Sequence, residues 1–119
     1  GMSRCLTMAS SRAMIQADFF VNASGDLTGF RLTGHSGAAE QGSDIVCAAV
    51  SSAAYMTANT VSDVLRAQAH ITADEGYMSV RVAERDVRAC RDLLEGFKLH
   101  LLGLEEQYPQ NIQVSYLEV

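Results

Sequence analysis

The sequence has little of several residue types, and each shortage excludes a class of protein. Its 119 residues include no tryptophan, one proline, and nine lysines and arginines against 14 aspartates and glutamates. The net charge of −5 argues against broad electrostatic binding of nucleic acid, which needs a basic face. The three cysteines form no Cys-x-x-Cys pair, so a disulfide framework is not expected. We predict no metal site and no cofactor.

Long apolar runs are also scarce. No segment suggests the roughly 20 apolar residues of a membrane span, and the N-terminus has no apolar core of signal-peptide type. We therefore expect a cytoplasmic protein with no membrane partner. The composition is that of an ordinary globular protein, 48% hydrophobic and 19% charged. Residues 1–13 have no periodicity and are expected to be a disordered leader or an expression remnant, and 14–119 to be a single domain.

Hydrophobic periodicity predicts the fold class. Alternating apolar residues predict five strands, at 13–22, at 27–34, at 67–74, around 78–82 and around 112–116. Two helices are expected, one from Ser43 or Asp44 to about Arg66 and one from about Arg85 to Gln107. The order strand-strand-helix-strand-strand-helix-strand predicts an α+β fold, a mixed or antiparallel sheet with both helices packed on one face.

The first predicted helix has an unusual composition. Residues 45–62 carry no charge and are mostly Ala, Ser, Thr and Val. We expect such a helix to be buried on most sides, against the sheet and against a second subunit. This favours a homodimer formed through helix 44–66 or through a sheet edge. The second helix has one apolar stripe, and Cys90 falls on it and is expected in the core.

Two residues suggest a catalytic site. His35 ends the second strand, and Cys47 follows twelve positions later, in the first turn of the uncharged helix. The N-terminus of a helix favours a thiolate and offers N–H groups to an oxyanion. A nearby imidazole can take the thiol proton and later give it to a leaving amine. The pattern suggests a nucleophile and a general base, although a lone cysteine on an alanine-rich helix is more often a small buried hydrophobe.

The loop between these two residues, 36–43, has almost nothing to bury. We expect it to be mobile without substrate and to order over a bound peptide, which makes it a substrate gate. The residues assigned to this gate are Ser36, Gly37, Gly42 and Ser43.

A family resemblance adds to this interpretation. Gly34-His35, together with Ser43-Asp44-Ile45-Val46-Cys47-Ala48-Ala49-Val50-Ser51, closely resembles the ribosomal-processing cysteine protease family, Prp. Met14-Ile15 resembles the family's usual start, and Glu106-Gln107-Tyr108-Pro109 resembles its late helix terminus. The resemblance therefore covers about residues 14–117. It implies a homodimeric α+β endopeptidase that removes the N-terminal extension of a large-subunit ribosomal protein.

The same resemblance implies roles for three residues. Cys47 matches the family's nucleophile and His35 its general base. Asp44 matches an acidic supporting position, whose role stays open between capping the helix, orienting His35 and holding the closed loop.

Two other functions fit the same residues. One is a non-catalytic dimeric module that binds a ribosomal protein without cutting it. The sequence pI of 5.0 suits a basic protein client and disfavours direct binding of nucleic acid. The other is a redox sensor that uses Cys47, for which Cys5 could act as the resolving cysteine only if residues 1–13 fold back. His70 and His100 are expected at the surface or in packing contacts.

Overall fold

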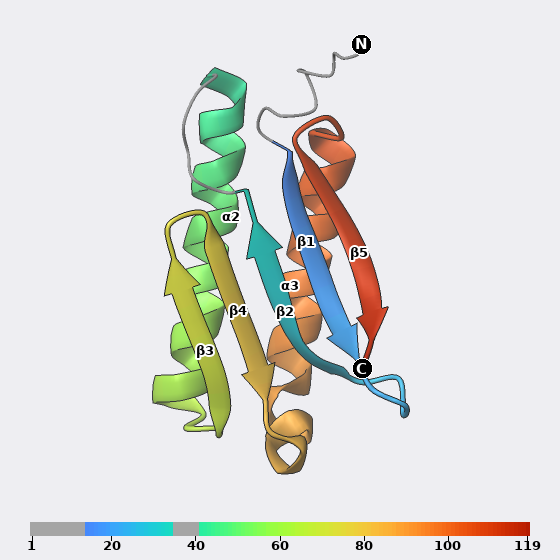
Figure 1. Cartoon of the computed structure of the whole chain (residues 1–119). Coiled ribbons are helices and arrows are strands. Elements are labelled where there is room, and N and C mark those ends of the chain that lie inside the picture. The colour runs from blue at the N-terminus through green and yellow to red at the C-terminus, as the bar shows by residue number, and fades with distance from the viewer. Residues whose placement is uncertain (1–13, 35–40) are drawn as a thin grey trace.

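The fold has two layers, a five-stranded sheet and a pair of helices on one of its faces (Figure 1). The computed structural model describes residues 14–34 and 41–119, with the backbone alone for 41–44. The elements are β1 (Ile15–Val21), β2 (Leu27–Thr33), α2 (Gln41–Asn59), η1 (Thr60–Val64), β3 (Ala69–Asp74), β4 (Tyr77–Val82), η2 (Glu84–Asp86), α3 (Val87–Gln107) and β5 (Ile112–Glu118). The α+β class and the element order are confirmed.

The sheet is mixed. Its strand order is β3-β4-β2-β1-β5, and every neighbouring pair is antiparallel except β1 and β5, which run parallel. Both tight hairpins turn through a glycine in the left-handed region, Gly25 at φ +85° and Gly76 at φ +73°. Glycine adopts this backbone conformation without the penalty that a Cβ atom brings.

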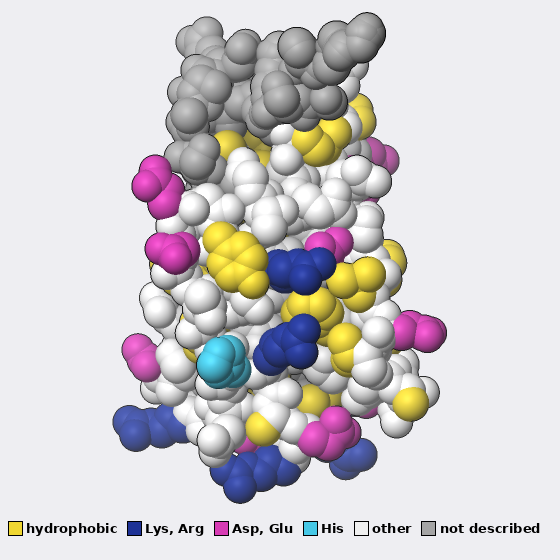
Figure 2. Space-filling model, in the orientation of Figure 1, with side chains coloured by type: hydrophobic (Ala, Val, Ile, Leu, Met, Phe, Trp, Pro, Cys, Tyr) yellow, Lys and Arg dark blue, Asp and Glu magenta, His cyan; other side chains and the backbone are white. Residues whose placement is uncertain are grey.

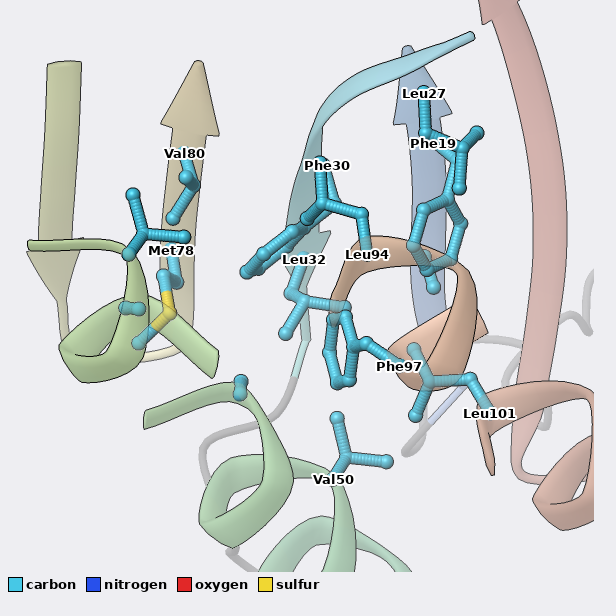
Figure 3. Packing of buried hydrophobic residues seen from close by; sticks show 14 of the residues in the cluster. Phe19, Leu27, Phe30, Leu32, Val50, Met78, Val80, Leu94, Phe97 and Leu101 are labelled. Carbon is cyan, nitrogen blue, oxygen red and sulfur yellow. The ribbon is translucent and has the colours of Figure 1, made fainter. Parts of the chain in front are cut away.

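The core lies between the sheet and the helices (Figure 3). The ring of Phe97 on α3 packs 5.7 Å from that of Phe19 and 4.7 Å from that of Phe30, centroid to centroid. The apolar stripe of α3 faces the sheet as predicted, and its buried members are Val87, Cys90, Leu94, Phe97 and Leu101. Burying these side chains contributes about 1.5–3 kcal/mol each, and it fixes the distance between the helices and the strands.

Helix α2 is only partly buried within a single chain. Val46 and Val50 are fully buried, but Ile45 is 58% and Met56 60% exposed. In a two-layer fold, a helix meets the sheet on one side and its neighbouring helix on another, which leaves its outer side open. A single chain therefore buries only part of this helix, and the expected burial of the rest against a second subunit stays a prediction.

The combined length of α2 and η1 corrects an expectation from the sequence. The 20 residues Ile45–Val64 are long and apolar enough to span a membrane by length and composition alone, whereas no such segment was expected. Val46, Val50, Ala54 and Val61 of this stretch are fully buried in the core. We therefore interpret the stretch as the core helix of a folded domain.

Candidate active site

Cys47 lies on the side of α2 that packs into the core. It is 4% exposed and belongs to the same hydrophobic cluster as Val46 and Val50. Because α2 begins at Gln41, Cys47 is its seventh residue and lies in the second turn rather than the first. The helix dipole acts mainly within the first turn. The effect of the helix dipole at Cys47 is therefore weaker than a position in the first turn would give.

The early start of α2 also corrects the predicted loop. Gly42 and Ser43 were expected in the gate, but they lie in the first turn of the helix. Once Val46 and Val50 dock against the sheet, adding residues upstream costs little, and Gln41 is a good helix former. Ser36 and Gly37, the other two gate residues, lie outside the described residues.

Asp44 is the fourth residue of α2, near its N-terminal end. A carboxylate near this end of a helix interacts favourably with the unpaired N–H groups there. Ser43 or Asp44 was expected to cap the helix, and a capping residue precedes the helix. Both residues lie inside α2, which begins at Gln41. The other two roles considered for Asp44 concern its side chain, which lies outside the described atoms.

His35 lies outside the described residues, but the residue before it is well defined. Gly34 directly follows β2, has φ +83°, and donates its N–H to the carbonyl of Gly76 at 3.0 Å. A Cβ atom at this position would be 2.8 Å from the carbonyl oxygen of Met14. The chain therefore leaves β2 toward His35 from a tightly held point. Sequence analysis noted Gly34 only as part of a motif, because the contact with Met14 is not visible in a sequence.

The remaining cysteines and histidines offer no second site. Cys90 is fully buried, and burial, reinforced by the charge of Asp86, raises the pKa of its thiol. This confirms Cys90 as a core residue. His70 and His100 are exposed, as expected. Cys5 lies outside the described residues. Within the described part of the chain, no three His, Cys, Asp or Glu residues gather as metal ligands.

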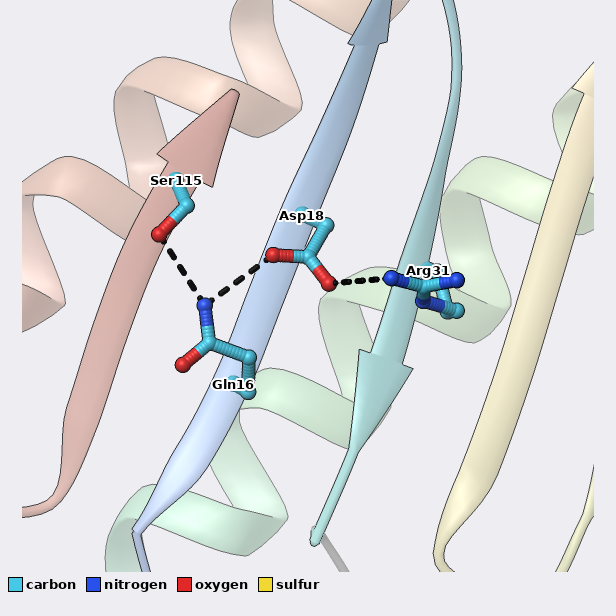
Figure 4. Close-up of polar contacts among 4 residues, drawn as sticks. All are labelled: Gln16, Asp18, Arg31 and Ser115. Atoms are coloured by element: carbon cyan, nitrogen blue, oxygen red, sulfur yellow. Dashed lines mark hydrogen bonds and ion pairs between the residues drawn. The ribbon is translucent and has the colours of Figure 1, made fainter. Parts of the chain in front are cut away.

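The sheet face opposite the helices carries a polar cluster that sequence analysis missed. Asp18 is buried there and accepts a hydrogen bond from Arg31 at 2.9 Å and another from Gln16 at 3.0 Å (Figure 4). Figure 2 looks onto this face, and the guanidinium groups of Arg31 and Arg81 both lie over the ring of Phe20 on it. The alternation of β1 and β2 contains a signal for this pairing, since Asp18 and Arg31 both fall on the polar side.

Comparison with known proteins places this geometry in a family. A family model described as cysteine protease Prp matches residues 14–113. The ribosomal processing cysteine protease Prp of Staphylococcus aureus is 29% identical over 105 residues, which cover 87% of this chain and 99% of that protein. The match includes both the end of β2 and the start of α2.

Solved structures agree with the sequence comparison. The S. aureus protease Prp in complex with a substrate peptide superposes with a TM-score of 0.80 and 27% identity, covering 87% of this chain and all of that one. SMU.848 from Streptococcus mutans superposes with a TM-score of 0.79 and 30% identity, covering 90% of this chain and 97% of that one. The S. aureus enzyme with a covalently linked product peptide gives a TM-score of 0.76 at 28% identity, with 87% and 100% covered.

Proposed function

This chain belongs to the cysteine protease Prp family, and on that basis we propose that it removes the N-terminal extension of a large-subunit ribosomal protein. The observation that carries the proposal is the position of Cys47, buried in the second turn of the core helix that follows β2 in the chain. The S. aureus relative, described as an essential ribosomal processing protease, supports the choice of substrate.

The proposed reaction uses Cys47 as nucleophile and His35 as general base. His35 takes the proton from the thiol of Cys47, and the sulfur attacks the carbonyl carbon of the scissile peptide bond. The negative charge that develops on the carbonyl oxygen is stabilised by backbone N–H groups in the first turn of α2. The C–N bond then breaks, and His35 gives its proton to the departing amine, which becomes the new N-terminus of the ribosomal protein.

A second half-reaction restores the enzyme. The removed extension remains bound to Cys47 as a thioester. His35 deprotonates a water molecule, which attacks the thioester carbonyl and releases the extension with a free carboxyl group. Cys47 regains its proton in this step. A relative with a covalently linked product peptide supports a covalent route of this kind.

Asp44 and the segment before α2 complete the proposed site. Asp44 has a supporting role near the first turn of the helix. Ser36 and Gly37 belong to a segment that closes over the bound peptide and excludes water. Gly42 and Ser43 belong to the first turn of α2 and not to that segment.

We also propose that the active form is a cytoplasmic homodimer that does not bind nucleic acid directly. The open side of α2 exposes Ile45, Tyr55 and Met56, each at 46% or more. A second copy of the chain would remove these side chains from water. The net charge of −5 favours contact with the basic tails of ribosomal proteins over contact with RNA.

Mass measurement tests the proposed function. The protein is incubated with the extended ribosomal protein, and the mass of the client is followed. A single defined loss from the N-terminus is expected with the native chain and with Cys90→Ala, and an intact client is expected with Cys47→Ala. Cys47→Ala and Cys90→Ala are matched variants, because each removes one buried thiol. A client that co-elutes uncut with the native chain would instead identify a binding module.

A further inference from the structure

We propose that a groove on the outer surface of α3 is a second contact site for the client, and that it binds a basic segment that carries an apolar side chain. The proposal deepens the proposed function and rests on it, because the client is the extended ribosomal protein. The groove has a volume of about 540 Å³ and is lined by residues from the C-terminal part of α3: Gly96, Leu99, His100, Gly103, Leu104 and Gln107.

The groove lies on the flank of α3 that points away from β5. Two contacts mark the opposite flank. The ammonium of Lys98 lies over the ring of Tyr116 on β5, 5.7 Å from its centroid, and the carboxylate of Glu105 accepts the N–H of Val114 on the same strand at 2.9 Å. Each glycine of the groove precedes one of these two α3 residues by two positions, which is about 200° around a helix. The groove is therefore on the outer surface of the helix layer, on the side of α2 (Figure 1).

The groove leaves apolar surface open to water. The side chain of Leu99 is 70% exposed, although leucine is an apolar residue that could pack elsewhere. A Cβ atom at Gly96 or at Gly103 would meet no atom of the described residues within 4 Å, and neither glycine has a positive φ. Each of them weakens the helix relative to alanine without admitting a neighbour from its own chain. The space above the two glycines is therefore open to a group from another molecule.

The charge at one end of the groove selects a basic occupant. Residues 99–119 include three acidic residues, Glu105, Glu106 and Glu118, and no lysine or arginine. Glu106 is exposed beside Gln107 of the groove, and it forms no ion pair with any residue that the structure describes. The last turn of α3 contains no basic residue, so the negative end of the helix dipole is not offset there. A lysine or arginine of a partner would be attracted to this end of the groove.

A ribosomal protein meets these requirements better than a second copy of this chain. A second copy carries a net charge of −5, which opposes its approach to the acidic end of α3. A basic client supplies both groups that the groove asks for, an apolar side chain against Leu99 and a cation near Glu106. Because these two residues are seven positions apart on one helix, the two groups of the client would lie about 10 Å from each other.

A contact away from the reacting atoms has a recognisable kinetic effect. It binds the client equally well before and during the reaction, so its loss raises KM and leaves kcat unchanged. A short peptide limited to the residues around the scissile bond does not carry the rest of the client. The KM of such a peptide is therefore expected not to depend on the groove.

The experiment measures kcat and KM for the whole extended ribosomal protein and for the short peptide. Gly103→Gln fills the groove and is expected to raise the KM of the whole client about tenfold, the effect of losing one central contact of an interface. It is also expected to raise the unfolding temperature, because glutamine is the better helix former. Glu106→Lys is expected to raise the same KM at low salt, with an effect that shrinks at high salt. Both variants are expected to keep the native kcat and the native KM of the short peptide.

Two matched variants serve as controls and are expected to keep the native KM. Ala89→Gln places the same side chain on an exposed position about 21 Å back along α3, and Glu118→Lys makes the same charge change on β5. A native KM for the whole client in both groove variants, or equal effects in the controls, would overturn the second contact site alone. Loss of a dimer in Gly103→Gln, measured by sedimentation, would overturn it in favour of a second copy. A native chain that cuts neither substrate would overturn the proposed function, and this site with it.

Discussion

Asp18 and Arg31 form an ion pair at 2.9 Å across the β1–β2 pair, on the sheet face that no described element covers. The side chain of Asp18 is only 10% exposed, whereas that of Arg31 is 37% exposed. Gln16 donates both to Asp18 and to the hydroxyl of Ser115, each at 3.0 Å. This cluster links β2, β1 and β5, which includes the one parallel pair of the sheet.

Removing the carboxylate is expected to destabilise the fold. Asp18→Ala leaves the buried side of Arg31 and the amide of Gln16 without their acceptor, which costs about 1–3 kcal/mol in the free energy of unfolding. The control is Asp74→Ala at the exposed end of β3, where a change within about 0.5 kcal/mol is expected. Urea unfolding measures both. Equal effects of the two substitutions would show that the cluster does not stabilise the sheet.

Two glycines are expected to respond to alanine with opposite signs. A Cβ atom on Gly29 would lie 1.9 Å from the carbonyl oxygen of Val80 on the neighbouring strand, so Gly29→Ala must separate β2 from β4. Gly96 lies inside α3, where a Cβ atom meets nothing within 4 Å. Gly96→Ala is therefore expected to stabilise the chain by about 0.5–1 kcal/mol. Thermal unfolding measures the change in stability for both variants. Destabilisation by Gly96→Ala would contradict the description of α3.

The buried thiol of Cys90 predicts a pH dependence of stability. Burial, followed by the charge of Asp86, raises its pKa above the ordinary value of 9.0. Below that value, the contribution of the buried, protonated thiol to the free energy of unfolding is fully present. As the pH rises past it, the unfolded chain loses the thiol proton first, and the contribution is lost. The native chain is therefore expected to lose more stability above pH 9.0 than Cys90→Ala does. Parallel denaturation curves for the two chains across this range would contradict the assignment.

The proposed dimer predicts which surface change produces a monomer. Met56 is 60% exposed on the open side of α2, and Ile71 is 36% exposed on the edge strand β3. Met56→Glu is expected to give a monomer in sedimentation at micromolar concentration, because it places a charge in the apolar contact. Ile71→Glu serves as the control and is expected to remain dimeric. The reverse result would assign the contact to the sheet edge, and a monomeric native chain would exclude the dimer.

Local patterns predicted most of the fold. The alternation of β1, β2 and β4 and the stripe of α3 follow from which side chains can be buried, and the structure agrees with both. The exposed side of α2 was not predictable. Ala, Ser and Thr fit equally well against a core, a partner or water, so the composition of residues 45–62 does not say which side is covered.

The candidate site was predicted from a motif rather than from geometry. The spacing of His35 and Cys47 identifies two reactive side chains but does not place them relative to each other. The contact of Gly34 with Met14 joins residues that are far apart in the sequence, and no local period reveals such a contact. The start of α2 was misplaced for a similar reason, because docking of Val46 and Val50 extends the helix beyond its capping signals.

The most direct test of the central claim is to trap the covalent intermediate on Cys47. The native chain is mixed with the extended ribosomal protein, quenched in acid within the first turnover, and digested for mass spectrometry. We predict an adduct on the Cys47 peptide equal to the mass of the removed extension minus one water, absent from Cys47→Ala and present in Cys90→Ala. Processing of the client by Cys47→Ala at the native rate, with no adduct on the native chain, would contradict the account.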